Sequence, residues 1–147
     1  MRRPLALLVA TAILVPSVFA EAQSLRARQK HIKAEEQQAE KISSVNKTCG
    51  TEIEAGFDWD TFPDEVFKTK YSIPLYCEHP LEAMRNLCRS NDGDLAKEAI
   101  SSKVSAVICQ YGEERQMALD EGTMRYTIHF GTRNDYRYVY EWLLDNL

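Results

Sequence analysis

Apolar and polar residues alternate along several short segments of the chain, a period that is typical of strands with one solvent-exposed face. The first segment is 51–59, with apolar residues at Ile53, Ala55, Phe57 and Trp59. Residues 103–111 are apolar on both sides, as in an interior strand. Residues 116–119 and 123–130 are predicted to pair as a hairpin about Gly122, because glycine readily adopts a positive φ.

A helical period of apolar residues appears in three other segments. Pro80 suits the first turn of a helix that begins at His79, and a second helix is predicted over 94–100. Thr132 and Asp135 form a capping-box-like pair before the last helix. The expected apolar faces of these helices are Leu81, Met84, Leu87 and Cys88; then Leu95, Ala96, Ala99 and Ile100; then Tyr136, Val139, Tyr140, Leu143 and Leu147.

The predicted order of elements is β-α-α-β-β-β-α, with a further turn or two of helix at Pro63. Strands with one polar face need helices on the other face only. The sequence therefore predicts an α+β fold, in which an antiparallel sheet of about four strands has helices packed on one face.

Residues 1–20 resemble a secretory signal peptide. Arg2 and Arg3 precede an apolar run, and Ser17 and Ala20 are small residues suited to cleavage after Ala20. The alternative is an uncleaved anchor, but residues 5–20 are shorter than the roughly 20 residues that a membrane span needs. We therefore expect a periplasmic or secreted protein, with membrane attachment only if the leader is retained.

Residues 21–48 form a charged segment between the leader and the domain expected at 49–147. Helix-favouring residues dominate it, but the apolar positions Leu25, Ile32 and Ala39 recur every seven residues without the second series that a coiled-coil seam requires. The segment is interpreted as a frayed, solvated helix or a flexible tether. The alternative is an arm that docks on a partner or on the domain itself.

Charge is distributed unevenly along the chain. Residues 21–48 carry six Lys or Arg against four Glu, whereas residues 49–147 carry ten Lys or Arg against eighteen Asp or Glu. An acidic domain repels nucleic acid phosphates and anionic membranes. Nucleic-acid binding is therefore not expected, and a partner attracted by this charge would be basic.

The four cysteines of an exported chain are expected to form disulfides. A pair between Cys77 and Cys88 is excluded, because eleven residues of mostly helical rise separate them by about 16 Å, beyond the roughly 7 Å limit between bridged Cα atoms. Of the two remaining arrangements, Cys49–Cys77 with Cys88–Cys109 is favoured. Each bridge is expected to contribute roughly 3 kcal/mol, so a reducing agent should lower the thermal midpoint.

The sequence contains no motif that specifies an enzyme, a metal site or a cofactor site, and none of these is predicted. The cysteine spacing lacks a C-x-x-C pair and the close couples of a structural zinc site. A nucleophilic cysteine needs an adjacent base. No histidine is expected to lie beside a cysteine; the three candidates are His31, His79 and His129.

Acidic residues gather near Asp58, where a strand runs into a loop, and include Asp60, Asp64 and Glu65. Their spacing does not match an EF-hand, so a solvated acidic loop is the preferred interpretation. A carboxylate pair for glycoside hydrolysis, such as Glu52 or Glu54 with Asp58, is kept as the alternative.

One aromatic group is a candidate contact surface. On the last helix Tyr138 is expected to point outward, near Arg137 and Trp142, and these residue types are common in binding hot spots. The function expected is a non-enzymatic protein-interaction domain, in concrete form an inhibitor or immunity-type binder of a basic partner. The alternative is a small periplasmic hydrolase that uses the acids near Asp58.

Overall fold

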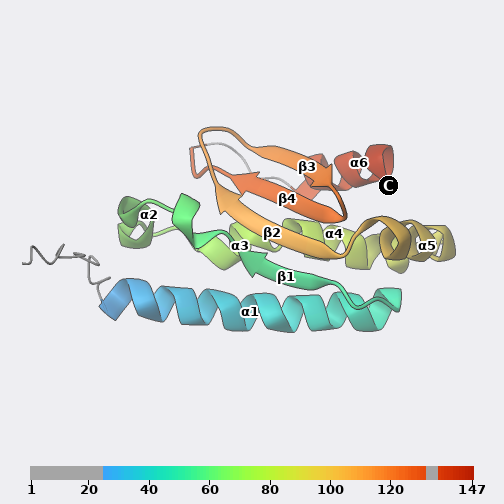
Figure 1. Cartoon of the computed structure of the whole chain (residues 1–147), viewed down its shortest axis with the longest axis horizontal. Helices are drawn as coiled ribbons and strands as arrows, with labels where there is room; N and C mark the ends of the chain where they lie inside the picture. Colours follow the sequence, from blue (N-terminus) through green and yellow to red (C-terminus); the bar gives the residue numbers. More distant parts are fainter. Residues whose placement is uncertain (1–24, 132–135) are drawn as a thin grey trace, which may run out of the picture.

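The computed structural model of the protein describes residues 25–131 and 136–147. Its elements follow one another from a long N-terminal helix to a short C-terminal one (Figure 1). The helices are α1 (Leu25–Cys49), α2 (Asp64–Lys68), α3 (Ile73–Cys77), α4 (His79–Cys88), α5 (Gly93–Lys103) and α6 (Tyr136–Asn146), with a 3-10 turn η1 (Trp59–Thr61). The strands are β1 (Glu54–Phe57), β2 (Ala106–Tyr111), β3 (Gln116–Asp120) and β4 (Thr123–Ile128).

The four strands form one mixed sheet in the order β1-β2-β4-β3. β1, β2 and β4 are parallel, and only β3 pairs antiparallel with β4. The α+β class is confirmed, but the prediction of a purely antiparallel sheet is wrong. The chain between β1 and β2 carries α2, α3, α4 and α5, which is long enough for the crossover that a parallel pair needs. Side-chain alternation does not reveal strand direction, because it is the same in both directions.

Several predicted elements are confirmed by the structure. β2 lies inside the sheet, α4 begins at His79, and β3 and β4 form a hairpin. Glu121 and Gly122 both have positive φ at its turn, which matches the twist of the paired strands. Helix α3 was not predicted, because five residues are too few to show a period. The predicted capping pair of Thr132 and Asp135 lies outside the described residues.

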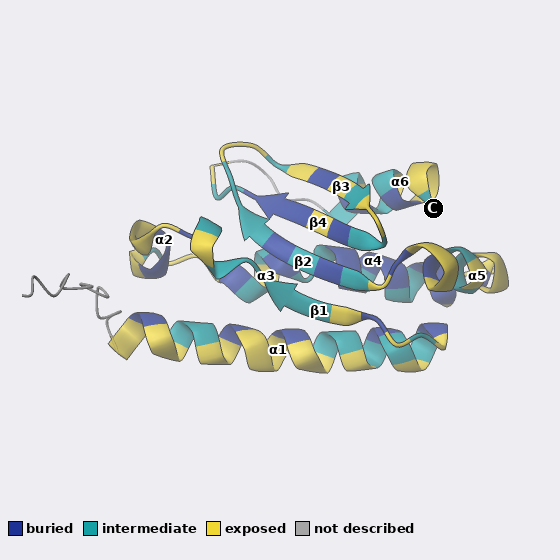
Figure 2. Cartoon of the chain, in the orientation of Figure 1, coloured by how far each residue is buried: buried dark blue, intermediate teal, exposed yellow. Residues whose placement is uncertain are grey.

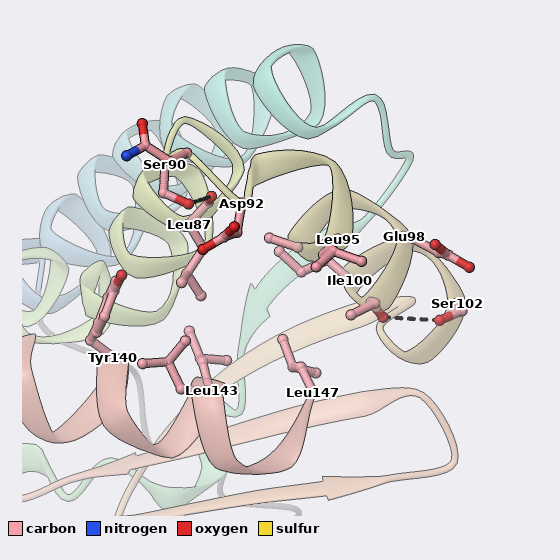
Figure 3. Close-up of a pocket in the computed structure, with 14 residues that line it drawn as sticks. Leu87, Ser90, Asp92, Leu95, Glu98, Ile100, Ser102, Tyr140, Leu143 and Leu147 are labelled. Carbon is pink, nitrogen blue, oxygen red and sulfur yellow. Dashed lines mark hydrogen bonds between the residues drawn. The ribbon is translucent and has the colours of Figure 1, made fainter.

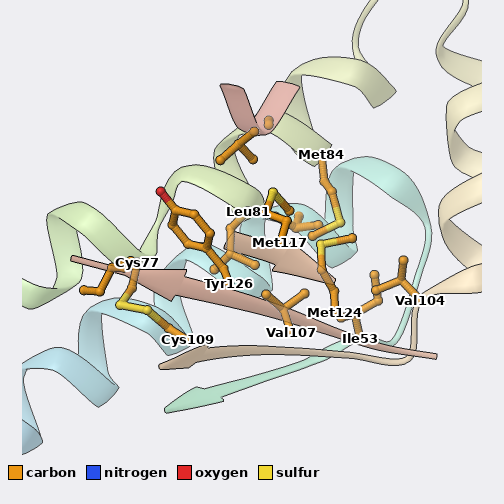
Figure 4. Close-up of a cluster of buried hydrophobic side chains, with 14 of the residues drawn as sticks. Ile53, Cys77, Leu81, Met84, Val104, Val107, Cys109, Met117, Met124 and Tyr126 are labelled. Carbon is orange, nitrogen blue, oxygen red and sulfur yellow. A yellow bond between two sulfur atoms is a disulfide. The ribbon is translucent and has the colours of Figure 1, made fainter. Parts of the chain in front are cut away.

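The core lies between the sheet and the helices behind it (Figures 1 and 4). Alternate residues of the central strands point into the core and contact the apolar side of α4. The two-residue period of the strands and the 3.6-residue period of the helix predict this arrangement. The largest fully buried side chains include Tyr126, Leu81, Met84, Ile100 and Met124. No helix covers the opposite face of the sheet (Figure 2). The strand register places Glu54 and Arg125 on this face, and both are exposed.

Helix α1 packs along the β1 edge of the molecule, so the interpretation of this segment as a frayed helix or flexible tether is wrong (Figure 1). The docking alternative is confirmed for the described part, since α1 lies on the acidic domain. Lys41 forms an ion pair with Glu78 at 2.8 Å, and Lys30 Nζ donates to the carbonyl oxygens of Phe67 and Thr69. The residues that α1 buries are Ala27, Ala34, Gln38, Val45 and Cys49.

Two disulfides join Cys49 to Cys88 and Cys77 to Cys109, with Cα separations of 5.4 and 5.6 Å. The exclusion of Cys77–Cys88 is confirmed, but the favoured pairs Cys49–Cys77 and Cys88–Cys109 are wrong. The reason is the position of α1. Because this helix packs beside α4, its last residue meets the last residue of α4, and Cys77 at the end of α3 remains for the sheet.

The disulfides are consistent with an oxidising compartment. Among the described residues, no helix combines the length and the apolar character that crossing a membrane requires. The leader predicted at residues 1–20 lies outside them.

Candidate functional site

An apolar groove of about 680 Å³ lies between α5 and α6, beyond the end of α4 (Figure 3). Leu87, Ile100 and Leu143 are buried at its base. Leu95 and Leu144 stand on its sides with exposed fractions of 70% and 60%. Two large aliphatic side chains are thus left in water beside a hollow of the size that ligand sites usually have, roughly 300–1,000 Å³.

The two ends of the groove are held by specific local contacts. At one end Gly93 begins α5 against the last turn of α4, and a Cβ there would lie 2.4 Å from the carbonyl oxygen of Cys88. Only glycine allows this close approach. At the other end Lys103 Nζ donates to the main-chain oxygens of Asn146 and Leu147, which ties the end of α5 to the end of α6. The groove is therefore a built part of the fold.

The rim of the groove is polar and acidic. Asp92 and Glu98 are the charged side chains that line it, both exposed, and Ser90, Asn91 and Ser102 complete the polar rim. Among the described lining residues there is no Lys or Arg. The site thus combines apolar contact inside with a negative field outside, which favours an apolar ligand that carries positive charge.

The apolar pattern of the sequence predicts only part of this groove. Leu95 was expected on the buried side of its helix together with Ile100, but in α5 Ile100 is buried in the core and Leu95 is exposed to solvent. Leu144 was not among the predicted residues. The available signal was the doublet Leu143-Leu144, because neighbouring helical residues point about 100° apart and the apolar stripe of this helix already includes Leu143.

The carboxylates proposed for a hydrolase lie outside the groove. Glu52 and Glu54 are exposed, and neither they nor Asp58 line the groove. The main chain of Asp58 bonds to Cys109 and Thr61 and positions η1. Asp60, Asp64 and Glu65 are exposed as well.

All four cysteines are in disulfides, so no free thiol is available to pair with a histidine as a nucleophile. His31 stacks on Trp59 with ring centroids 4.1 Å apart, and burial lowers its pKa while nearby Glu35 raises it in part. His129 Nδ1 lies 2.8 Å from the carbonyl oxygen of Gly112. His79 begins α4.

The predicted contact group on α6 is only partly exposed. Tyr138 and Trp142 are half-buried, and the guanidinium of Arg115 lies 3.9 Å from the Tyr138 ring centroid. Arg137 is exposed and bonds to Glu141 at 2.7 Å. None of the three residues lines the groove.

A second, smaller hollow lies between the N-terminal half of α1 and the loop before α3. Its volume is about 360 Å³, and Lys30, Lys33 and Lys70 line it. Lys30 already holds the main chain of the loop, so the hollow is mainly a joint between α1 and the domain.

No group of His, Cys, Asp and Glu that could hold a metal ion occurs within residues 25–131 and 136–147. Comparison of the chain with protein-family models, with curated proteins and with solved structures finds no match.

Proposed function

We propose that this protein is an exported, non-enzymatic binding domain that takes an amphipathic, basic segment of a partner protein into the groove between α5 and α6. The observation that carries the proposal is the pair of exposed leucines, Leu95 and Leu144, on the two sides of an apolar hollow. Exposed aliphatic pairs of this kind are costly in water and mark sites of contact.

The shape of the groove supports a helical occupant. Two helices, α5 and α6, form its walls, and an amphipathic helix commonly lays its apolar side into such a groove. Leu95 and Leu144 would then contact apolar side chains spaced three or four residues apart on the partner.

Charge supports a basic occupant. Asp92 and Glu98 lie on the rim, and residues 49–147 together are acidic. A fatty acid or another anionic amphiphile would meet like charge at the rim, whereas Lys or Arg beside an apolar stripe would be attracted. An inhibitor or immunity-type protein for a basic toxin or hydrolase is the concrete form of this function.

Selection of peptides from a displayed library on the disulfide-bonded protein tests the proposal. We expect the selected peptides to share apolar residues at helical spacing with Lys or Arg beside them. Leu95→Glu and Leu144→Glu should each weaken binding by at least about tenfold, because a carboxylate then replaces apolar contact.

Leu75→Glu is the matched control, since Leu75 is 55% exposed and lies in α3 outside the groove. Circular dichroism should show the same thermal midpoint for all three variants, because each site is on the surface. Peptides that bind Leu95→Glu and Leu144→Glu as tightly as the unchanged protein, or that are mainly acidic, would contradict the proposal.

A further inference from the structure

The outward side of α1 carries a second apolar stripe that the domain does not cover. Helix α1 buries Ala27, Ala34 and Val45 against the domain. Leu25, Ile32 and Ala39 recur every seven residues on the opposite side, and all three are exposed. The exposed fractions of Leu25 and Ile32 are 72% and 57%. A stripe with this spacing suits contact with another helix.

Charge on the same helix is divided between its two halves. Arg26, Arg28 and Lys33 lie in the N-terminal half, and Glu36 and Glu40 follow them. All five are exposed. Within one copy this order is unfavourable, because basic residues lie at the positive end of the helix dipole. The order becomes favourable when a second helix runs in the opposite direction alongside.

We propose that α1 pairs antiparallel with α1 of a second copy of this chain, about a two-fold axis at Ile32. Ile32 then contacts Ile32 of the partner copy at the axis. On either side of the axis each Leu25 lies opposite an Ala39, so a large side chain faces a small one. Arg26 and Arg28 face the region of Glu36 and Glu40 on the other copy, twice by symmetry.

A parallel pair would instead place basic residues beside basic residues and acidic beside acidic, so charge selects the antiparallel arrangement. The overlap over residues 25–39 is about 22 Å long, which is short for an interface. The two Lys33 side chains also come near the axis and repel one another. A weak dimer in exchange with monomer is therefore expected. The α5–α6 groove is elsewhere on the molecule and is not needed for this contact.

Complementary charge reversals test the arrangement by analytical ultracentrifugation of the disulfide-bonded protein. Arg26→Glu with Arg28→Glu makes both charged groups that flank the stripe acidic, and Glu36→Lys with Glu40→Lys makes both basic, whereas Lys33 is unchanged in either variant. Each doubly substituted protein alone should lose the dimer. A mixture of the two should form a heterodimer about as tight as the original dimer, because residues 26 and 28 again face residues 36 and 40 of opposite charge and the contact between the two Lys33 side chains is unchanged.

Lys68→Glu with Lys70→Glu is the charge-matched control for the acidic variant. Both lysines are exposed and lie outside α1, and this variant should dimerise like the unchanged protein. Recovery in the mixture also separates loss of contact from loss of folding, since an unfolded variant would not regain a partner.

Engineered cysteines test the direction of the pair. Ile32→Cys should cross-link to itself, Ala39→Cys alone should not, and Leu25→Cys mixed with Ala39→Cys should cross-link. Self-linking of Ala39→Cys would contradict the antiparallel pair. A monomer over roughly a hundredfold range of concentration would overturn the dimer. So would a monomer that binds phosphatidylglycerol vesicles and loses that binding with Ile32→Lys, because the stripe would then contact lipid.

Discussion

His31 lies among aromatic rings at the N-terminal half of α1. Its ring is parallel to that of Trp59 and 4.6 Å from that of Phe67, and Trp59 in turn donates a hydrogen bond to Glu35 at 2.9 Å. Nε2 of His31 is buried. These contacts join α1 to η1 and α2, and they favour a neutral imidazole because a charged ring would lose hydration there.

The pKa of His31 is lowered from 6.5, mainly by burial and against the opposing effect of Glu35. The unfolded chain therefore takes up this proton at a higher pH than the folded protein does. The contribution of His31 to stability is fully present above about pH 6.5, is lost as the pH drops from there to the lowered folded value, and changes no further below it. His31→Phe keeps a ring and removes the proton, so it should flatten this part of the curve. Urea unfolding of both proteins between pH 7.5 and 5 measures the effect, and equal slopes in the two proteins would contradict it.

At the scale of elements, α1 and the disulfides depend on one another. Asn46 near the end of α1 accepts hydrogen bonds from Thr51 Oγ1 and the Ile53 main-chain N–H, and donates to the Ile53 carbonyl. This turn leads the chain from α1 directly into β1. Cys49–Cys88 then fastens the last turn of α1 to α4. The bridge and the turn together set how α1 lies on the domain.

Removing Cys49–Cys88 should loosen α1 while most of the sheet persists. The bridge spans 39 residues, so the chain-entropy model predicts a loss of about 4 kcal/mol in the free energy of unfolding for Cys49→Ser with Cys88→Ser. Hydrogen exchange should rise most in α1.

Mass spectrometry of the unchanged protein should recover peptides linked Cys49–Cys88 and Cys77–Cys109. Recovery of Cys49–Cys77 would refute the pairing, and uniform protection of α1 in the variant would refute its role.

At the scale of the whole molecule, the folded unit includes α1 and does not begin at Cys49. Ala34 and Val45 on α1 are almost completely buried, and Ala27 and Cys49 belong to the same core as the sheet. Without α1, Ile53 and the adjoining sides of β1 and α4 would face water. The charged helix also brings a net positive charge onto an acidic domain, as the Lys41–Glu78 pair illustrates.

A chain that starts at Cys49 should therefore be far less stable than one that starts at Leu25. We expect the shorter chain to aggregate or to bind a hydrophobic dye, because burial of α1 contributes a sizeable part of a small core. Thermal unfolding of the two chains compares them directly. Equal midpoints would show that α1 is the independent arm that the sequence suggested.

The sequence by itself predicts the elements whose signals are local. β2, the β3–β4 hairpin, α4 and α6 follow from periods of two or 3.6 residues and from proline and glycine at turns, because side-chain direction repeats within a few residues. The α+β class follows from the same patterns. On the groove, local patterns located Ile100 and Leu143 but not the exposure of Leu95.

The tertiary structure decided what depends on contacts between distant residues. Strand direction, the partners of Cys49 and Cys77, and the packing of α1 are of this kind. The buried stripe of α1 consists mostly of small or polar residues such as Ala27, Ala34 and Gln38, so its hydrophobic signal is weak and the stronger Leu25 and Ile32 face solvent. Close packing favours small side chains where a helix lies near a sheet edge, and no local period reports where that edge will be.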